Sequence, residues 1–340
     1  MYTSLDLGSQ LPRWRLTDCS GLSEVSTGPP RRQQLSDVRK PAAMREHFPP
    51  SSGRDRIQGL IDVHFHSAPD VFDRCMDDEG AAWLCKERGM EAIVLKNHVV
   101  PTADRAWFVR KHVNGLKVFG GVALNAAVGG INPDAVQWMS RMQGGYGRFV
   151  WFPTIDSDHH VRHFDDGPAG IKVLQPSGDV LPEVYEVLKI CAKHRLVVNT
   201  GHLSPEEALA VIAASRDVGV DRLIVTHAQF EIVHMSLAQM KQATAMGAKL
   251  EICAVGPLMG AHSHLEWMRA WRQVSISETV EAVHAIGADH FVLGTDLGQA
   301  GNPLHVDGLE MFVNDLIHGG VSSDEIKLMG REVPGALLLG

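Results

Sequence analysis

Residues 60–69 read LIDVHFHSAP, and this stretch separates two ways of building an alternating α/β fold. Its first part is apolar and rich in branched side chains, as in a buried parallel strand. A doubly wound open sheet usually carries a glycine-rich phosphate loop directly after its first strand. Here that position holds HFHSAP. The stretch therefore favours a closed (β/α)8 barrel, with the open sheet as the alternative.

The same kind of apolar run recurs along the chain, and amphipathic stretches typical of helices separate most of the runs. Ser204, followed by Pro205 at the first helical position and Glu207 at the third, predicts a capping box that begins a helix. Glycines placed after the amphipathic stretches predict helix ends. The predicted strands are residues 60–66, 92–98, 118–125, 149–155, 196–202, 223–227, 249–255 and 291–296, and the predicted stop glycines are Gly89, Gly219, Gly247 and Gly287. We therefore expect an α/β protein whose residues 58–340 form one (β/α)8 TIM barrel.

Residues 1–57 differ from the rest of the chain. They contain the proline-rich and basic pieces GPPRRQQ, RKPAA and FPPSSGR and show no sustained strand or helix period. We expect an N-terminal extension that is partly irregular, either disordered or wrapped over the barrel. A regulatory or partner-binding arm is the alternative.

The composition excludes several classes of protein. The 340 residues are 44% hydrophobic and 21% charged, which excludes disorder for most of the chain. The net charge is −8, and without a basic stripe a nucleic-acid partner is not expected. No apolar run is long enough to span a membrane. The five cysteines form no CxxC pair, so we expect free thiols in a reducing, cytoplasmic compartment. We also expect a small-molecule substrate, with homo-oligomer formation left open.

Metal-competent side chains stand where the predicted strands end. His64 and His66 lie two residues apart and so face the same side of a strand. His202, His227 and Asp296 end three further apolar runs. Because a barrel builds its active site at the carboxyl ends of its strands, these five side chains predict a shared metal site.

The ordered set of HFH on the first strand, single histidines closing the fifth and sixth, and TD closing the eighth resembles the amidohydrolase superfamily of metal-dependent hydrolases. The resemblance covers about residues 59–340. The segments VLKNHVVPTADRA, GHLSPEE and TDLGQAGNP look like an uncharacterised subgroup. The closing EVPGALLLG is similar to the final helix of such proteins, although their usual Asn-Pro-Ala is Val-Pro-Gly here.

The resemblance implies a role for each of these residues. His64 and His66 would bind one metal with Asp296, and His202 and His227 would bind a second metal or join the first. Zn²⁺ suits these ligands, with Mn²⁺, Fe²⁺ or Ni²⁺ as alternatives, at one or two ions per chain. The implied reaction is hydrolysis of a C–N or C–O bond, in an amide, cyclic amide, ester or lactone, by metal-bound hydroxide with Asp296 as general base and acid. Decarboxylation or C–C hydrolysis on the same barrel, and a non-catalytic metal-binding protein, are the alternatives.

Two lysines compete for roles near such a site. Lys96 and His98 share one face at the end of the second predicted strand, and we expect them to bind substrate; Lys96 carboxylation and an exposed loop lysine are alternatives. Family members with two metals bridge them with a carboxylated lysine, and Lys172 is the candidate. However, the turn-like QPSG at 175–178 predicts a small hairpin that points Lys172 to solvent. The polar stretch 156–163 is either a substrate-facing loop or surface, and Glu251 needs a buried partner that the sequence does not show.

Overall fold

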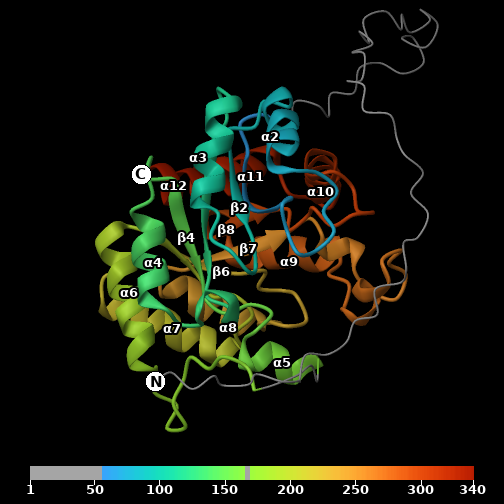
Figure 1. Cartoon of the computed structure of the whole chain (residues 1–340). Coiled ribbons are helices and arrows are strands. Elements are labelled where there is room, and N and C mark those ends of the chain that lie inside the picture. Colours follow the sequence, from blue (N-terminus) through green and yellow to red (C-terminus); the bar gives the residue numbers. More distant parts are fainter. Residues whose placement is uncertain (1–55, 165–168) are drawn as a thin grey trace, which may run out of the picture. The chain divides into compact units, whose positions relative to one another are not determined.

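A computed structural model describes residues 56–164 and 169–340, which form an eight-stranded parallel sheet closed into a barrel (Figure 1). Each strand pairs in parallel with the next, in the order β1 to β8. The first and last strands meet through residues just beyond β8: the Asp296 N–H donates to the His64 carbonyl, and the His66 N–H donates to the Leu297 carbonyl. The strands are β1 (Ile61–His66), β2 (Ala92–Lys96), β3 (Lys117–Ala123), β4 (Gly147–Trp151), β5 (Val197–Asn199), β6 (Leu223–Val225), β7 (Lys249–Cys253) and β8 (Phe291–Gly294).

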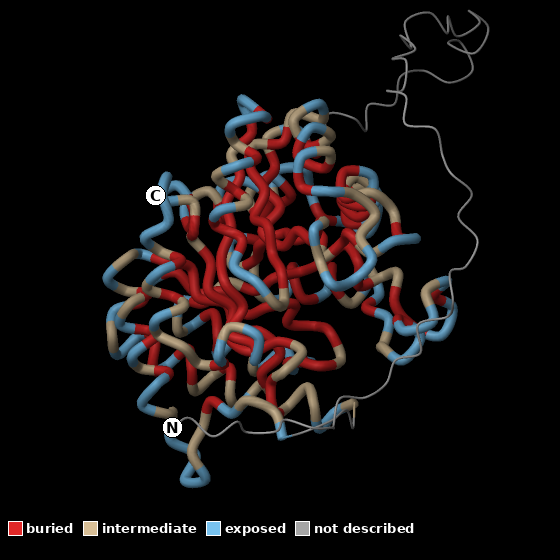
Figure 2. Tube along the Cα trace, viewed as in Figure 1, coloured by how far each residue is buried: buried red, intermediate tan, exposed pale blue. Residues whose placement is uncertain are grey.

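Helices follow the strands and cover the outside of the barrel. Figure 2 shows the strands as a buried inner layer and the exposed residues on the outer turns of the helices. The α-helices are α2 (Asp78–Glu87), α3 (Ala103–His112), α4 (Pro133–Ser140), α5 (Asp158–Phe164), α6 (Pro182–His194), α7 (Pro205–Asp217), α8 (Leu237–Ala245), α9 (Ile276–Ile286), α10 (His305–His318), α11 (Ser323–Lys327) and α12 (Val333–Leu339). The short helical turns are η2 (Ala126–Val128), η3 (Gly256–Leu258), η4 (Glu266–Ala270), η5 (Ala288–His290) and η6 (Leu328–Glu332).

The predicted (β/α)8 barrel is confirmed, because all eight predicted strands are present. Seven of them end two to four residues before the predicted ends, so their polar terminal residues lie just beyond the pairing. The capping box of Ser204 and Glu207 opens α7 as predicted. The four predicted stop glycines follow α2, α7, α8 and α9, each with a positive φ between 72° and 107°. A positive φ strains other residues but not glycine, so these glycines end helices without strain.

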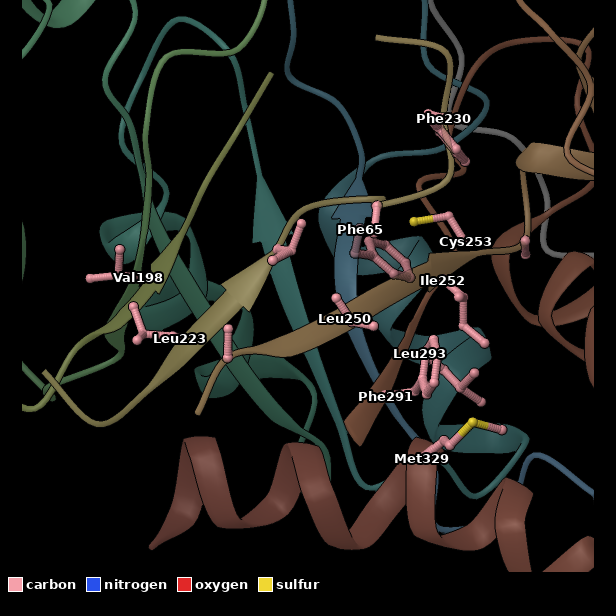
Figure 3. Packing of buried hydrophobic residues seen from close by; sticks show 14 of the residues in the cluster. Phe65, Val198, Leu223, Phe230, Leu250, Ile252, Cys253, Phe291, Leu293 and Met329 are labelled. Atoms are coloured by element: carbon pink, nitrogen blue, oxygen red, sulfur yellow. The ribbon is translucent and has the colours of Figure 1, made fainter. Parts of the chain in front are cut away.

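Two apolar cores hold the barrel together. The larger one lies between the strands and the helices, and Figure 3 shows Leu250 and Ile252 of β7 with Phe291 and Leu293 of β8 inside it. The smaller one fills the barrel from inside and includes Val333, Leu337 and Leu338 of α12. The Leu337 carbonyl accepts a hydrogen bond from Arg222, the residue before β6. Thus α12 closes the end of the barrel where the strands begin and leaves their carboxyl ends for the site.

The N-terminal extension predicted over residues 1–57 lies outside the described residues, apart from Arg56 and Ile57. Ile57 is buried in the larger core, so at least this position belongs with the barrel. Cys75, Cys85, Cys191 and Cys253, the cysteines of the described part, are free thiols as expected. In residues 56–164 and 169–340, no helix has the length and apolar character needed to span a bilayer.

Candidate metal centre

A bulge in β1 aims both of its histidines into the mouth of the barrel. The pairing of β1 with β2 shifts between Asp62 and Phe65, and Val63 belongs to the core inside the barrel. The buried Asp62 carboxylate holds this bend, because it accepts the His64 N–H at 3.0 Å and the N–H and hydroxyl of Thr295 at 2.9 and 2.6 Å. Bulges commonly redirect side chains beside active sites. One acidic side chain therefore fixes the end of β1, which carries His64 and His66, and the residues after β8, among them Asp296.

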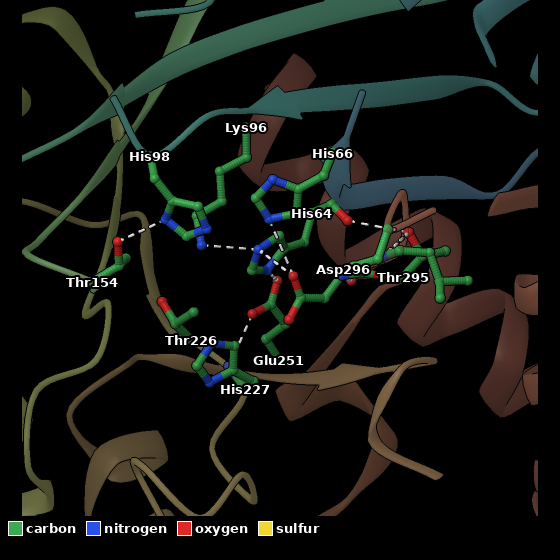
Figure 4. Close-up of polar contacts among 12 residues, drawn as sticks. His64, His66, Lys96, His98, Thr154, Thr226, His227, Glu251, Thr295 and Asp296 are labelled. Carbon is green, nitrogen blue, oxygen red and sulfur yellow. Dashed lines mark hydrogen bonds and ion pairs between the residues drawn. The ribbon is translucent and has the colours of Figure 1, made fainter. Parts of the chain in front are cut away.

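Three potential ligand atoms converge at this point (Figure 4). Asp296 Oδ1 lies 3.1 Å from His64 Nε2 and 3.2 Å from His66 Nε2. A tetrahedral ion with bonds of about 2.0–2.1 Å to nitrogen and oxygen separates its ligand atoms by about 3.3 Å. Asp296 reaches this position with a φ of 50°, in the left-handed region where strained functional residues are often found. The spacing and the chemistry of the three groups fit a divalent transition metal.

Glu251 of β7 orients His64 from behind. Its Oε1 lies 3.1 Å from His64 Nδ1, and its Oε2 accepts the His227 N–H at 2.9 Å. Burial alone would raise the pKa of Glu251, but His64 and these hydrogen bonds hold it below its usual range. An ionised Glu251 holds one His64 proton on Nδ1, and Nε2, on the other side of the ring, faces Asp296. A carboxylate behind a metal-binding histidine commonly has this effect.

The amino group of Lys96 lies beside His64 Nε2, the same atom that faces Asp296. Its side chain is 1% exposed, and Nζ lies 2.9 Å from His64 Nε2. Burial lowers the pKa of Lys96. Burial would also lower the pKa of His64, but Asp296 and Glu251 raise it to about 9. Because two nitrogens at this separation cannot both donate to each other, one of Lys96 Nζ and His64 Nε2 donates and the other accepts.

His66 is a neutral imidazole in this arrangement. Burial and the neighbouring Arg74 hold its pKa well below the usual range. An Arg74 nitrogen lies 3.2 Å from His66 Nδ1, and the same guanidinium pairs with Asp70. Because a guanidinium can only donate, Nδ1 accepts and the proton sits on Nε2, facing Asp296. An ion at Nε2 would have to displace that proton and turn Arg74 away from Nδ1.

The two remaining predicted ligands lie beside this group. The His227 ring centre is 5.9 Å from that of His64 and 4.9 Å from that of His202. His227 Nδ1 is buried and has no hydrogen-bond partner among the described residues, and burial lowers the pKa of His227 to about 4. His160 of α5 adds a further imidazole, with its Nδ1 2.9 Å from His202 Nδ1. The structure thus brings all five predicted residues to one mouth.

Lys172, the candidate bridging lysine, is exposed and lies away from β4. Its segment runs through an antiparallel bridge between Leu174 and Val180, and the backbone N–H of Gly178 donates to Gln175 within the turn. The hairpin interpretation of residues 171–181 is therefore confirmed. No bridging position is available to Lys172 in this geometry.

The sequence alone does not assign four residues of the site. Glu251 is an acid in need of a buried partner, but its contacts with His64 and His227 join residues far apart in the chain. His160 stood in a polar stretch with no sign of which histidine would turn inward. Asn125 and Thr154, just beyond β3 and β4, join a hydrogen-bond network with His98. The only signal for these two was their place at predicted strand ends.

The comparison with known families gives one match. The family described as "Family of unknown function (DUF6282)" matches residues 59–251, more than half of the chain. The chain belongs to DUF6282. The DUF6282 match takes in β1 through the middle of β7, so it includes Glu251 and all predicted ligands except Asp296. No curated protein matches the chain.

Solved structures share the fold of this DUF6282 chain at low sequence identity. An amidohydrolase from Pseudomonas aeruginosa is 11% identical, with a TM-score of 0.56 over 84% of this chain and 97% of that one. A 2,6-dihydroxybenzoate decarboxylase is 12% identical, with a TM-score of 0.54 over 83% and 100% of the two chains. The organophosphorus hydrolase from Deinococcus radiodurans is 14% identical, with a TM-score of 0.52 over 84% and 94%. These likenesses show the barrel fold.

Proposed function

We propose that this chain is a metal-dependent hydrolase of small molecules that cleaves a C–N or C–O bond in an amide, cyclic amide, ester or lactone. The proposed metal ligands are His64, His66, His202, His227 and Asp296. The observation that carries the proposal is the approach of Asp296 Oδ1 to His64 Nε2 and His66 Nε2 at 3.1 and 3.2 Å. It occurs at the end of the barrel where such folds carry their active sites.

The ligands would hold one or two ions of Zn²⁺, or of Mn²⁺, Fe²⁺ or Ni²⁺. Such an ion, when bound, brings the pKa of a water molecule toward neutrality and polarises a substrate oxygen. Burial would raise the pKa of Asp296, but His64 and His66 hold it well below its usual range. Asp296 is thus ionised, and its carboxylate is the proposed acceptor of the proton from the attacking water and the donor of that proton to the leaving group.

Lys96 and His98 are the proposed substrate-binding residues. Lys96 places its amino group 2.9 Å from His64 Nε2, and His98 stacks on His66 with ring centres 5.0 Å apart. A buried ammonium also suits a substrate carboxylate. This observation favours decarboxylation as the second candidate reaction. A decarboxylase is among the solved structures that share the fold.

A substrate panel separates these functions. Purified protein would be assayed against lactones, esters, amides, cyclic amides and aromatic carboxylates, with added Zn²⁺ or Mn²⁺ and with chelator. We expect chelator-sensitive hydrolysis that Asp296→Asn abolishes. The control is Asp221→Asn, since the Asp221 side chain is 75% exposed and lies next to Arg222, before β6. Chelator-insensitive turnover would contradict the metal mechanism, carbon dioxide release would favour the decarboxylase, and no turnover would favour a non-catalytic protein.

A further inference from the structure

His98, Asn125 and Thr154 form a hydrogen-bond network across the ends of three neighbouring strands, β2, β3 and β4. The Asn125 Nδ2 group donates to the His98 carbonyl at 2.9 Å and to Thr154 Oγ1 at 2.7 Å. Asn125 Oδ1 accepts the Thr154 N–H at 2.8 Å. The opposite orientation of the amide would place oxygen against the His98 carbonyl oxygen. The orientation of Asn125 is therefore fixed by its partners.

The Thr154 hydroxyl then determines where His98 carries its proton. Thr154 is fully buried, and its Oγ1 lies 2.9 Å from His98 Nδ1. A hydroxyl has one proton to donate and two lone pairs. One lone pair already accepts from Asn125, and His98 Nδ1 is the only acceptor for the hydroxyl proton among the described residues. A buried donor without an acceptor is costly, so Thr154 donates to Nδ1 and His98 carries its own proton on Nε2.

The protonated edge of His98 is free to meet a ligand. The ring is half-buried and stacks on His66 at an interplanar angle of 25°. It also makes a T-shaped contact with the Phe72 ring, with ring centres 5.9 Å apart. Within the described residues, Nε2 of His98 has no hydrogen-bond partner. Figure 4 shows the His98 ring hydrogen-bonded to Thr154 on one side, with Lys96 and His66 on the other. A neutral N–H donor thus stands at the mouth of the metal centre, in a fixed orientation.

We propose that the Nε2–H group of His98 is a catalytic hydrogen-bond donor to the carbonyl oxygen of an ester, lactone or amide substrate. The inference rests on the proposed hydrolase function and names the group that stabilises the negative charge developing on the carbonyl oxygen. As the water oxygen adds to the carbonyl carbon, its proton passes to Asp296 and the carbonyl π pair moves onto oxygen. That oxygen accepts a stronger hydrogen bond from His98. When the C–O or C–N bond breaks, the pair returns to the carbonyl, the leaving group takes the proton from Asp296, and His98 keeps its own proton throughout.

Asn125 and Thr154 are positioning residues in this proposal, since they act through His98. Removal of one donor to a developing oxyanion commonly lowers kcat by about 10²–10³-fold, and we expect a loss of that order for His98→Ala. Thr154→Val keeps the shape of the side chain but removes the donor to Nδ1. We expect kcat to fall at least about tenfold with KM within about twofold. Thr154→Ser, which restores a hydroxyl, should restore kcat.

The decisive readout is the tautomer of His98, measured by long-range ¹H–¹⁵N correlation on protein labelled at histidine. We expect Nε2–H in the wild type and in Thr154→Ser, and a mixed or Nδ1–H tautomer in Thr154→Val. Thr279→Val is the matched control, because the Thr279 hydroxyl is also buried but bonds to Gln229; it should change neither the tautomer nor kcat. The wild-type measurement needs no variant to fold.

The outcomes separate this inference from the proposed function. A wild-type His98 with its proton on Nδ1, or with both nitrogens protonated at neutral pH, overturns the inference alone. So does an unchanged kcat in Thr154→Val. An absence of turnover by the wild type on every ester, lactone and amide overturns the proposed function, and the substrate assignment of His98 with it.

Discussion

Replacing Glu251 with Gln should weaken metal binding by disturbing His64 rather than by removing a ligand. The two Glu251 oxygens accept from His64 Nδ1 and from the His227 N–H. Gln keeps one oxygen and turns an N–H group toward the other donor. The loss of one hydrogen bond to a charged group costs about 1.5–3 kcal/mol. If the whole cost falls on the orientation of His64, metal affinity falls about tenfold to 150-fold, because each 1.4 kcal/mol is a factor of ten.

The assay is competition for Zn²⁺ between the protein and a chromophoric chelator at fixed pH. Glu186→Gln on the exposed surface of α6 is the matched control and should bind like the wild type. Thermal unfolding of the chelated protein shows whether each variant is folded. A folded Glu251→Gln protein with an affinity within about twofold of the wild type would refute the reasoning that His64 depends on this carboxylate.

Three further predictions follow from particular residues. An ion bound at His64 Nε2 must displace the extra proton of the His64 imidazolium, whose pKa is about 9. Metal affinity should therefore rise about tenfold per pH unit from pH 7 to about 9 and then level off; chelator competition across this range checks it, and a flat profile contradicts it. Lys172→Met should leave metal stoichiometry and turnover unchanged, whereas loss of one ion per chain would restore the bridging role. Gly298→Ala should lower the free energy of unfolding in urea by at least about 1–3 kcal/mol, because the new Cβ would lie 2.0 Å from the His66 carbonyl oxygen at a φ of 126°. Gly178→Ala, at a positive φ but in open space, should lower the free energy of unfolding by less. Equal losses of stability in the two variants would contradict the steric argument.

The fold was predictable because its signals are local. Each strand is a short apolar run. Each of four helices is followed within two residues by a glycine that marks its end in the sequence. The ligand positions followed from the same source, since the carboxyl ends of parallel strands meet at one mouth. The turn at residues 175–178 identified the hairpin and so removed Lys172 from the site.

The supporting contacts were not predictable, because they depend on registers that a single sequence does not define. Glu251 and His64 are 187 residues apart, and their contact depends on the relative register of β1, β7 and β8. The bulge held by Asp62 depends on the Thr295 backbone, 233 residues away. The His98 tautomer needs Asn125 and Thr154 at the ends of two other strands. Each of these pairings combines ordinary polar residues, so no local pattern marks them.

The most direct test of the central claim is the transition-metal content of the purified chain, measured by elemental analysis. We expect about one or two ions per chain in the wild type, most of them lost in His64→Ala. We expect almost none in a folded His64→Ala, His202→Ala double variant. Full metal content in that double variant would contradict the assignment of the metal centre.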